Sequence, residues 1–168
     1  MKMNIPWACA LCIFAVATAS GQTKFPSSGI CGKPDVQQSI PAGDQEGHIF
    51  GIAQGKCVTI GEVGGVQSKE GMYSEHRDIS ANHTNAWGVY VETYENGDKI
   101  FYSYQSTSSV KDGAPPNGEN KYEMTGGTGK MKGITGSGIC KIAGKSDGGL
   151  DYSCTGDYTL AGAASAKR

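Results

Sequence analysis

The sequence predicts an all-β fold: an eight-stranded antiparallel closed barrel with an irregular N-terminal arm. Short runs rich in β-branched and aromatic residues alternate with glycine-rich or polar turns, and almost no segment has a helical period. The chain also carries 26 glycines, which suit tight turns and bent strands. Evenly spaced antiparallel strands favour a closed barrel over an open sheet, because closure removes exposed edges.

Residues 1–21 are predicted to be a secretory signal peptide. Lys2 precedes an apolar run from Trp7 to Val16, and small residues around Ala19 follow as the cleavage region. The apolar run of about ten residues is shorter than the roughly 20 that a membrane span needs. We therefore expect a secreted or periplasmic protein without stable membrane insertion.

The rest of the chain divides into an arm, one domain and a tail. Residues 22–46 contain Pro26, Pro34 and Pro41 and are expected to form an irregular arm. Residues 47–160 are expected to form the barrel domain, and the small, polar segment 161–168 a flexible tail. The predicted strands are 48–54, 57–63, 72–78, 87–94, 99–106, 120–125, 133–142 and 150–160.

Four cysteines remain after the signal peptide, and an even number in an exported chain predicts two disulfides. A three-residue loop at 146–148 would place Cys140 opposite Cys154 across a hairpin. Cys31–Cys57 then follows by elimination. No C-x-x-C motif remains and the spacings match no zinc site, so metal binding is the disfavoured interpretation.

The segment 87–106 is the clearest hairpin. Asn96-Gly97 predicts a type I′ turn, which pairs Tyr94 with Lys99 and Glu92 with Phe101. One face then carries Trp87, Val89, Val91, Thr93, Ile100, Tyr102 and Tyr104, and the other carries Tyr90, Glu92, Tyr94, Lys99, Phe101, Ser103 and Gln105. The first face is the better core candidate, although the sequence leaves open which face points inward.

The glycine-rich stretch "MTGGTGKMKGITGSGICKI" (124–142) contains "GTGK", which invites a phosphate-loop interpretation. That motif needs a glycine five positions before Gly129 and a hydroxyl after Lys130, and the chain has Met124 and Met131 there. A phosphate loop must also open a helix, whereas this stretch connects strands. We therefore expect these glycines to form a tight turn and to let a strand coil around the barrel.

The stretches "NGDKIFYSY" and "YEMTGGTGKMKGITGSG" resemble the late strands of the allene oxide cyclase/dirigent-like, calycin-like barrel superfamily. The resemblance covers about Trp87 to Tyr158. It implies an eight-stranded barrel with an axial cavity, often trimeric in plants. Plant members rearrange a fatty-acid epoxide or steer phenolic radical coupling, and many small exported bacterial-type members have no assigned activity.

Few residues suggest chemistry. Strand alternation places His76 and Asp78 on one face as a candidate acid/base pair, although a charged strand end explains them as well. If its face lines the lumen, Glu92 would lie beside Tyr90, Phe101 and Ser103, where desolvation favours a general acid or ligand anchor; otherwise it is a surface carboxylate. The histidines have no metal-ligand spacing, so we expect no metal and no cofactor.

Two functions remain from the sequence. The net charge of −1 and the lack of a basic run argue against nucleic acid as a partner. The favoured hypothesis is a non-catalytic, disulfide-stabilised barrel, monomeric or trimeric, that binds a small apolar or phenolic molecule in or near its lumen. The alternative is a lumen-based cyclase or isomerase.

Overall fold

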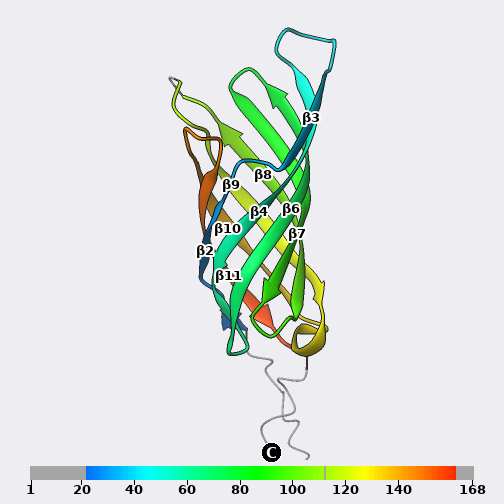
Figure 1. Ribbon diagram of the computed structural model, residues 1–168, viewed down its shortest axis with the longest axis vertical. Coiled ribbons are helices and arrows are strands. Elements are labelled where there is room, and N and C mark those ends of the chain that lie inside the picture. Colours follow the sequence, from blue (N-terminus) through cyan, green and yellow to red (C-terminus); the bar gives the residue numbers. More distant parts are fainter. Residues whose placement is uncertain (1–21, 112, 162–168) are drawn as a thin grey trace, which may run out of the picture.

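The computed structural model describes residues 22–111 and 113–161, so the predicted signal peptide and nearly all of the predicted tail lie outside the described residues. The described chain is almost entirely β-structure (Figure 1). Its elements are β1 (Thr23–Lys24), β2 (Ser27–Cys31), β3 (Val36–Pro41), β4 (Ile49–Ile60), β5 (Glu62–Val63), β6 (Val66–Ser80), β7 (His83–Tyr94), β8 (Lys99–Ser109), β9 (Asn117–Gly127), the 3₁₀ turn η1 (Gly129–Met131), β10 (Thr135–Gly144) and β11 (Leu150–Thr159).

Eight of these strands close into an antiparallel barrel, as predicted. The hydrogen-bonded order is β4-β2-β11-β10-β9-β8-β7-β6, and β6 pairs back onto β4. The short strands β1, β3 and β5 add to β11, β4 and β6 respectively. Among the described residues, no helix is long and apolar enough to cross a membrane.

The strand count is right, but the assignment of two strands is corrected. The predicted runs 48–54 and 57–63 are largely one continuous strand, β4, which does not break at Gly55. The eighth barrel strand is instead β2, from the segment 22–46 that we expected to be irregular. Position 55 requires glycine because a side chain there would meet the Tyr73 ring: a Cβ would lie 2.6 Å from the Tyr73 hydroxyl.

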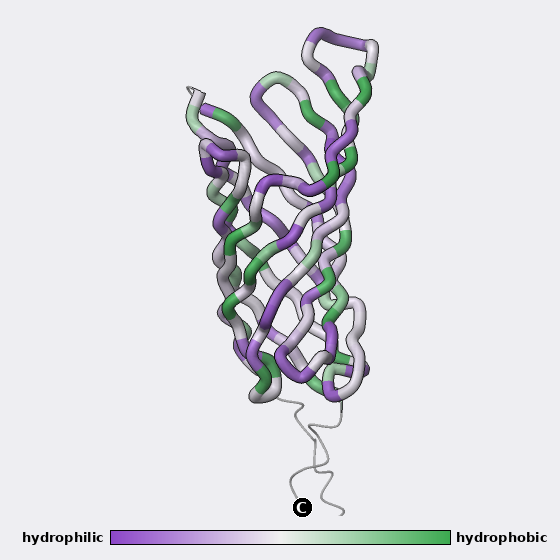
Figure 2. The backbone as a smooth tube through the Cα atoms, in the orientation of Figure 1, coloured by the Kyte–Doolittle hydropathy of each residue, from purple (hydrophilic) through white to green (hydrophobic). Residues whose placement is uncertain are grey.

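The inward face of β4 carries small residues and its outward face carries larger ones. Burial alternates strictly from Ala53 to Ile60, with Ala53, Gly55, Cys57 and Thr59 buried and the residues between them exposed. Figure 2 shows that polar and apolar residues are interspersed along the strands of the wall, and the exposed residues of β4 include the apolar Val58 and Ile60. Because small residues line this wall, tyrosine rings from the opposite strands have room to enter the lumen.

One end of the barrel is packed, and we call it the closed end. Its core includes Phe25, Val63, Tyr94, Ile100, Met131 and Ile134, each no more than 2% exposed. These residues come from the segment before β2, from β5, from the ends of β7 and β8 that flank their turn, and from η1 and the segment that follows it. The opposite end, the open end, is formed by the turns that join β3 to β4, β6 to β7, β8 to β9 and β10 to β11 (Figure 1).

Both predicted disulfides are present. Cys140 and Cys154 are direct partners on β10 and β11, and Cys31 and Cys57 are direct partners on β2 and β4. The predicted loop at 146–148 is confirmed: Lys145 N–H donates to Gly149 O (2.8 Å), and Gly148 takes a φ of +85°. This is a type I turn closed by a glycine bulge.

The predicted register of the 87–106 hairpin is wrong by one residue. Thr93 pairs with Lys99, Glu92 with Ile100 and Tyr90 with Tyr102. Only Gly97 of the turn has a positive φ (+83°), so the turn is again type I with a glycine bulge, not type I′. A one-residue slip moves a strand's side chains to the other face. The inward face therefore combines Tyr90, Glu92 and Tyr94 with Ile100, Tyr102 and Tyr104.

The glycine-rich stretch turns and bends the sheet, as predicted. Thr125 is an extra residue on β9 where the β8–β9 register shifts, and Gly129 and Gly133 have positive φ values. The Lys130 N–H, which would face phosphate in a nucleotide site, donates instead to Asp98 Oδ2 (2.9 Å). Asp98 follows the Asn96-Gly97 turn, so the "NGD" and "GTGK" segments hold each other in place.

Candidate functional site in the barrel lumen

The lumen contains a cavity of about 300 Å³ above the closed end. Six of the chain's eight tyrosines line it: Tyr73, Tyr90, Tyr102, Tyr104, Tyr122 and Tyr152. The two disulfides lie in the same wall. The cavity has the aromatic lining and the few polar groups that are typical of small-molecule sites, at the lower end of their size range of roughly 300–1,000 Å³.

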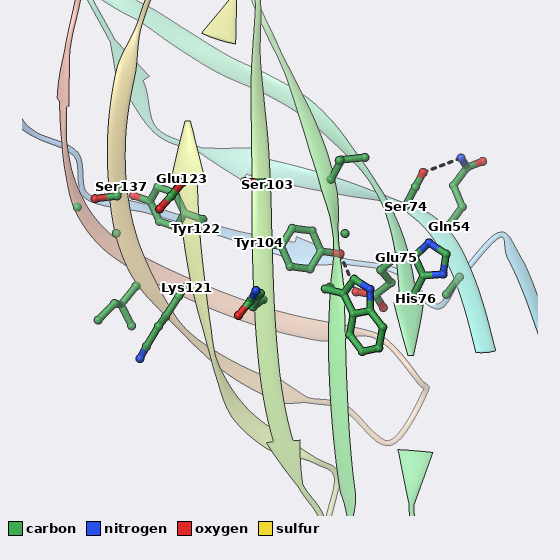
Figure 3. Close-up of a pocket in the computed structure, with 18 of the residues that line it drawn as sticks. Gln54, Ser74, Glu75, His76, Ser103, Tyr104, Lys121, Tyr122, Glu123 and Ser137 are labelled. Carbon is green, nitrogen blue, oxygen red and sulfur yellow. Dashed lines mark hydrogen bonds between the residues drawn. The ribbon is translucent and has the colours of Figure 1, made fainter. Parts of the chain in front are cut away.

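A second hollow, about 1400 Å³ in volume, is lined by outward side chains of the wall together with lumen residues such as Glu75, Tyr104 and Tyr122 (Figure 3). Side chains that line it, including Gln54, Ser74, Ser103 and Glu123, lie in register on β4, β6, β8 and β9. These side chains lie on the outward face of their strands, which we call the outer belt. We place the candidate site in the lumen because its polar groups are enclosed.

Glu92 is the most buried charged residue of the lumen, at 2% exposure. Its carboxylate accepts hydrogen bonds of 2.5 Å from Ser68 Oγ and from the Tyr102 hydroxyl. Ser68 precedes an irregularity in the β6–β7 register, between Ser68 and Glu70. Burial raises the pKa of Glu92, and the Ser68 and Tyr102 hydroxyls oppose that rise. The carboxyl group of Glu92 is thus harder to ionise than an exposed glutamate.

Above the closed end, three hydroxyls meet between β4, β7 and β11. Thr59 Oγ1 shares hydrogen bonds with the Tyr90 hydroxyl (2.6 Å) and the Tyr152 hydroxyl (2.7 Å). Close approach of the rings to the wall depends on glycine: a Cβ on Gly71 would lie 1.8 Å from the Tyr90 hydroxyl. Burial raises the pKa of Tyr90 and of Tyr152, so both stay neutral hydrogen-bonding groups.

A charged cluster lies further along the lumen, on β6 and β8. Glu75 accepts hydrogen bonds from Arg77 Nε (2.7 Å) and from the Tyr104 hydroxyl (2.6 Å), the second of which is drawn in Figure 3. Arg77 and Glu75 also form an ion pair at 2.6 Å, with both side chains largely buried. The carboxylate and the guanidinium neutralise each other, so this part of the lumen has no net charge.

Three buried side-chain polar atoms have no hydrogen-bond partner among the described residues. One is the Tyr94 hydroxyl, in the core of the closed end. The other two lie in the lumen wall and are the Tyr122 hydroxyl and Asn120 Oδ1, both on β9. Tyr122 is 7% exposed, and burial raises its pKa to about 12. A buried, unpaired polar atom costs on the order of 1–3 kcal/mol, so sites of this kind are often completed by a bound molecule or water.

The structure separates the predicted site residues. Tyr90 and Glu92 face the lumen, whereas Phe101 and Ser103 lie on the outer face, because the register differs by one residue from the prediction. His76 stacks against Trp87 on the outer belt, with ring planes 19° apart. Asp78 accepts a hydrogen bond from His48 Nε2 (3.0 Å) rather than from His76. Across residues 22–111 and 113–161, no histidine, cysteine or carboxylate group is arranged to hold a metal.

Sequence reasoning missed Thr59, Arg77, Asn120, Tyr122 and Tyr152 as lumen residues. Strand alternation in "YSEHRD" places Glu75 and Arg77 on the face opposite His76 and Asp78, but it does not tell which of the two faces lines the lumen. Nothing local marks Asn120 or Tyr122, because the inward face of β9 depends on its pairing with β8 and β10.

The raised pKa of Glu92 predicts a pH-dependent stability. Unfolding releases a proton wherever the unfolded glutamate (ordinary pKa 4.5) is ionised and the buried one is not. The free energy of unfolding therefore falls as pH rises from about 4.5 to the raised value, by at most about 1.4 kcal/mol per pH unit. Urea denaturation of the wild type and of Glu92→Gln at several pH values measures the difference.

In this comparison, Glu92→Gln should reduce the fall of the unfolding free energy with rising pH. Glu119→Gln, at an exposed position on β9, should leave that pH dependence unchanged. Parallel curves for the wild type and Glu92→Gln would show that Glu92 ionises in the folded barrel as it does in the unfolded chain.

No family model and no curated protein sequence matches the chain. Two solved structures of pterocarpan synthase dirigent proteins are similar to it. The first has 10% sequence identity and a TM-score of 0.45, over 95% of this chain and 99% of the other. The second has 10% identity and a TM-score of 0.42, over 83% of this chain and 97% of the other.

Proposed function

We propose that this barrel binds a small, largely apolar or phenolic molecule in its lumen without transforming it. The observation that carries the proposal is the pair of buried, unpartnered polar atoms, on Tyr122 and Asn120, in the wall of a 300 Å³ cavity. A ligand that hydrogen-bonds them would remove the cost of their desolvation.

The lining favours an aromatic ligand. Tyr90, Tyr102 and Tyr122 lie in successive edge or tilted contacts, with ring centroids 5.7–5.8 Å apart. Such rings offer edges and faces against which another aromatic ring packs favourably. The hydroxyls and the Asn120 amide would then orient the ligand, while the tyrosine rings supply most of the contact area.

The second candidate is a lumen-based cyclase or isomerase. It is favoured by Glu92, whose burial and raised pKa would suit a general acid. The same environment also explains Glu92 as a structural group, since Ser68 and Tyr102 already bond both of its oxygens. We therefore keep binding as the first proposal.

We also propose that the protein is exported, to the periplasm or the exterior. The two disulfides support this, since such bonds persist in oxidising compartments. Whether the chain is a monomer or a trimer would be measured in the experiment described next.

Native mass spectrometry of the protein purified from its own oxidising compartment tests the proposal. We expect a reproducible small-molecule adduct that is released on activation and contains an aromatic ring. Incubation of the adduct-loaded protein would separate the two candidates: an unchanged ligand supports binding, and a product whose formation is abolished in Glu92→Gln supports catalysis. A lumen that takes up no molecule from its native extract would contradict both.

Tyr122→Phe should separate ligand binding from folding. It removes an unpartnered hydroxyl, so we expect the ligand-free protein to gain about 1 kcal/mol of stability or to stay unchanged. The adduct should be weakened, because the hydroxyl no longer contacts the ligand. Thermal unfolding with and without the captured molecule measures both effects. A matched control is Tyr104→Phe, whose hydroxyl already bonds Glu75 and whose loss should destabilise the ligand-free barrel.

A further inference from the structure

The two halves of the lumen differ in chemistry. Toward the closed end the wall presents Tyr90, Tyr102 and Glu92. Toward the open end, Thr84 on β7 pairs with Ser108 on β8, and Ser106 on β8 pairs with Asn120 on β9. The cavity therefore runs from an aromatic floor to a rim where small hydroxyl and amide side chains lie beside apolar ones.

The rim carries both polar and apolar side chains and has no net charge: Ile79 and Ile142 lie in the same register row as Thr84 and Ser108. Asn120, Ser106, Ala86 and Arg77 occupy one register row across β9, β8, β7 and β6. Arg77 is the cation of that row, and it is committed to Glu75 through Nε and a terminal nitrogen. An anionic group entering the rim would have to compete with Glu75 for the guanidinium, and a cationic group would have to compete with Arg77 for the Glu75 carboxylate.

The unpartnered rim atom is an acceptor. Asn120 Oδ1 is buried and has no donor among the described residues. A ligand group beside Asn120 Oδ1 must donate a hydrogen bond to it, and the same ligand group can accept a hydrogen bond from a hydroxyl such as that of Ser106. Amides and alcohols both fulfil this pattern without carrying charge, whereas a carboxylate offers no donor.

From these observations we propose that the rim, defined by Arg77, Ser106, Ser108 and Asn120, binds the neutral hydrogen-bonding head of an amphipathic ligand whose aromatic end lies on the tyrosine floor. The inference rests on the proposed lumen function and narrows it. It names the ligand class as uncharged aromatic amides or alcohols, and it makes the Glu75–Arg77 pair the group that determines charge selectivity.

Three probes of one shape test this: 3-phenylpropanamide, 3-phenylpropanoate and 3-phenylpropylammonium. Affinities measured by ligand-observed NMR on the wild type should favour the amide over both ions by about tenfold, since a mismatched buried polar group costs on the order of 1–3 kcal/mol. Asn120→Leu should reduce the affinity for the amide to that for the ions. Gln105→Ala, on the outer face of β8 beside Ser106, is the matched control and should leave the affinities for all three probes unchanged.

Glu75→Gln is the decisive variant, because it keeps the shape of the site and frees the charge of Arg77. We expect it to bind the carboxylate about tenfold more tightly than the wild type does, with a smaller change for the amide. Ser106→Ala provides a second variant if Glu75→Gln unfolds. It should lower the affinity for 3-phenylpropanamide more than the affinities for the two ions.

The outcomes distinguish the two levels of the proposal. Wild-type protein that prefers the carboxylate, or binds all three probes equally, would overturn the neutral-head inference and leave lumen binding standing. Failure of all three probes to bind, in a folded protein whose lumen also takes up nothing from its native extract, would overturn lumen binding itself.

Discussion

Gly88→Ala is expected to lower the free energy of unfolding by about 3 kcal/mol or more, at the upper end of the cost of overpacking. Gly88 lies in β7 opposite Glu75, and a Cβ there would lie 2.3 Å from the Ser74 carbonyl oxygen and 2.9 Å from Glu75 Cα. These are backbone atoms of the neighbouring strand, so no side-chain rotation can relieve the clash. The strands must separate where β6 carries the Glu75–Arg77 pair.

Urea denaturation followed by circular dichroism measures this loss, and Gly32→Ala is the matched control. A Cβ on Gly32 meets nothing within 4 Å and its φ is not in the positive range, so that substitution should be nearly neutral. If Gly88→Ala were as stable as Gly32→Ala, the two strands would have to be further apart than the structure places them. Lumen binding should fall together with stability in Gly88→Ala.

Removal of either disulfide is expected to have an effect of similar size. For Cys140–Cys154, with a sequence separation of 14, the chain-entropy model gives a loss of about 3 kcal/mol. For Cys31–Cys57, with a separation of 26, it gives about 3.5 kcal/mol. The second bond also holds β2 against β4 where only four residue pairs join the two strands, and this seam completes the barrel.

Paired alanine substitutions, Cys140→Ala with Cys154→Ala and Cys31→Ala with Cys57→Ala, measure these losses by denaturation. Hydrogen exchange should show a difference between them: loss of Cys31–Cys57 should expose the amides of β2, and loss of Cys140–Cys154 should leave β2 protected. Wild type treated with a reductant should match the combined variants. Equal exchange of β2 in both pairs would mean that strand pairing alone closes the barrel.

The local chemistry of the β10–β11 hairpin was readable from the sequence. Asp147-Gly148 lies between two strand-like runs that each contain one cysteine at the same distance from the turn, so loop length and disulfide predicted the same register. The 87–106 hairpin lacks such a constraint. Asn96-Gly97 suits both a type I′ turn and a type I turn with a glycine bulge, and these differ by one residue in register.

Long-range contacts select the second turn. The Asn96 side chain bonds the Asp98 N–H (3.0 Å), and the Asp98 carboxylate accepts the Lys130 N–H from η1, 32 residues away. That choice brings Glu92 onto the same face as Tyr102 and leaves Phe101 and Ser103 outside. For this reason two of the four predicted ligand-binding residues, Tyr90 and Glu92, face the lumen, and the other two do not.

The sequence by itself determined the all-β class, the count of eight barrel strands, both disulfides and the bending role of the glycines, because each follows from periodicity, turn chemistry or cysteine arithmetic within short segments. The tertiary structure alone decided that β2 completes the barrel, that Glu92 is buried, and that Asn120 and Tyr122 are left unpartnered in the lumen. These depend on which strands become neighbours and in which register. A shift of one residue in register, which costs little within one hairpin, reverses the two faces of a strand, and only the closed barrel makes one choice better than the other.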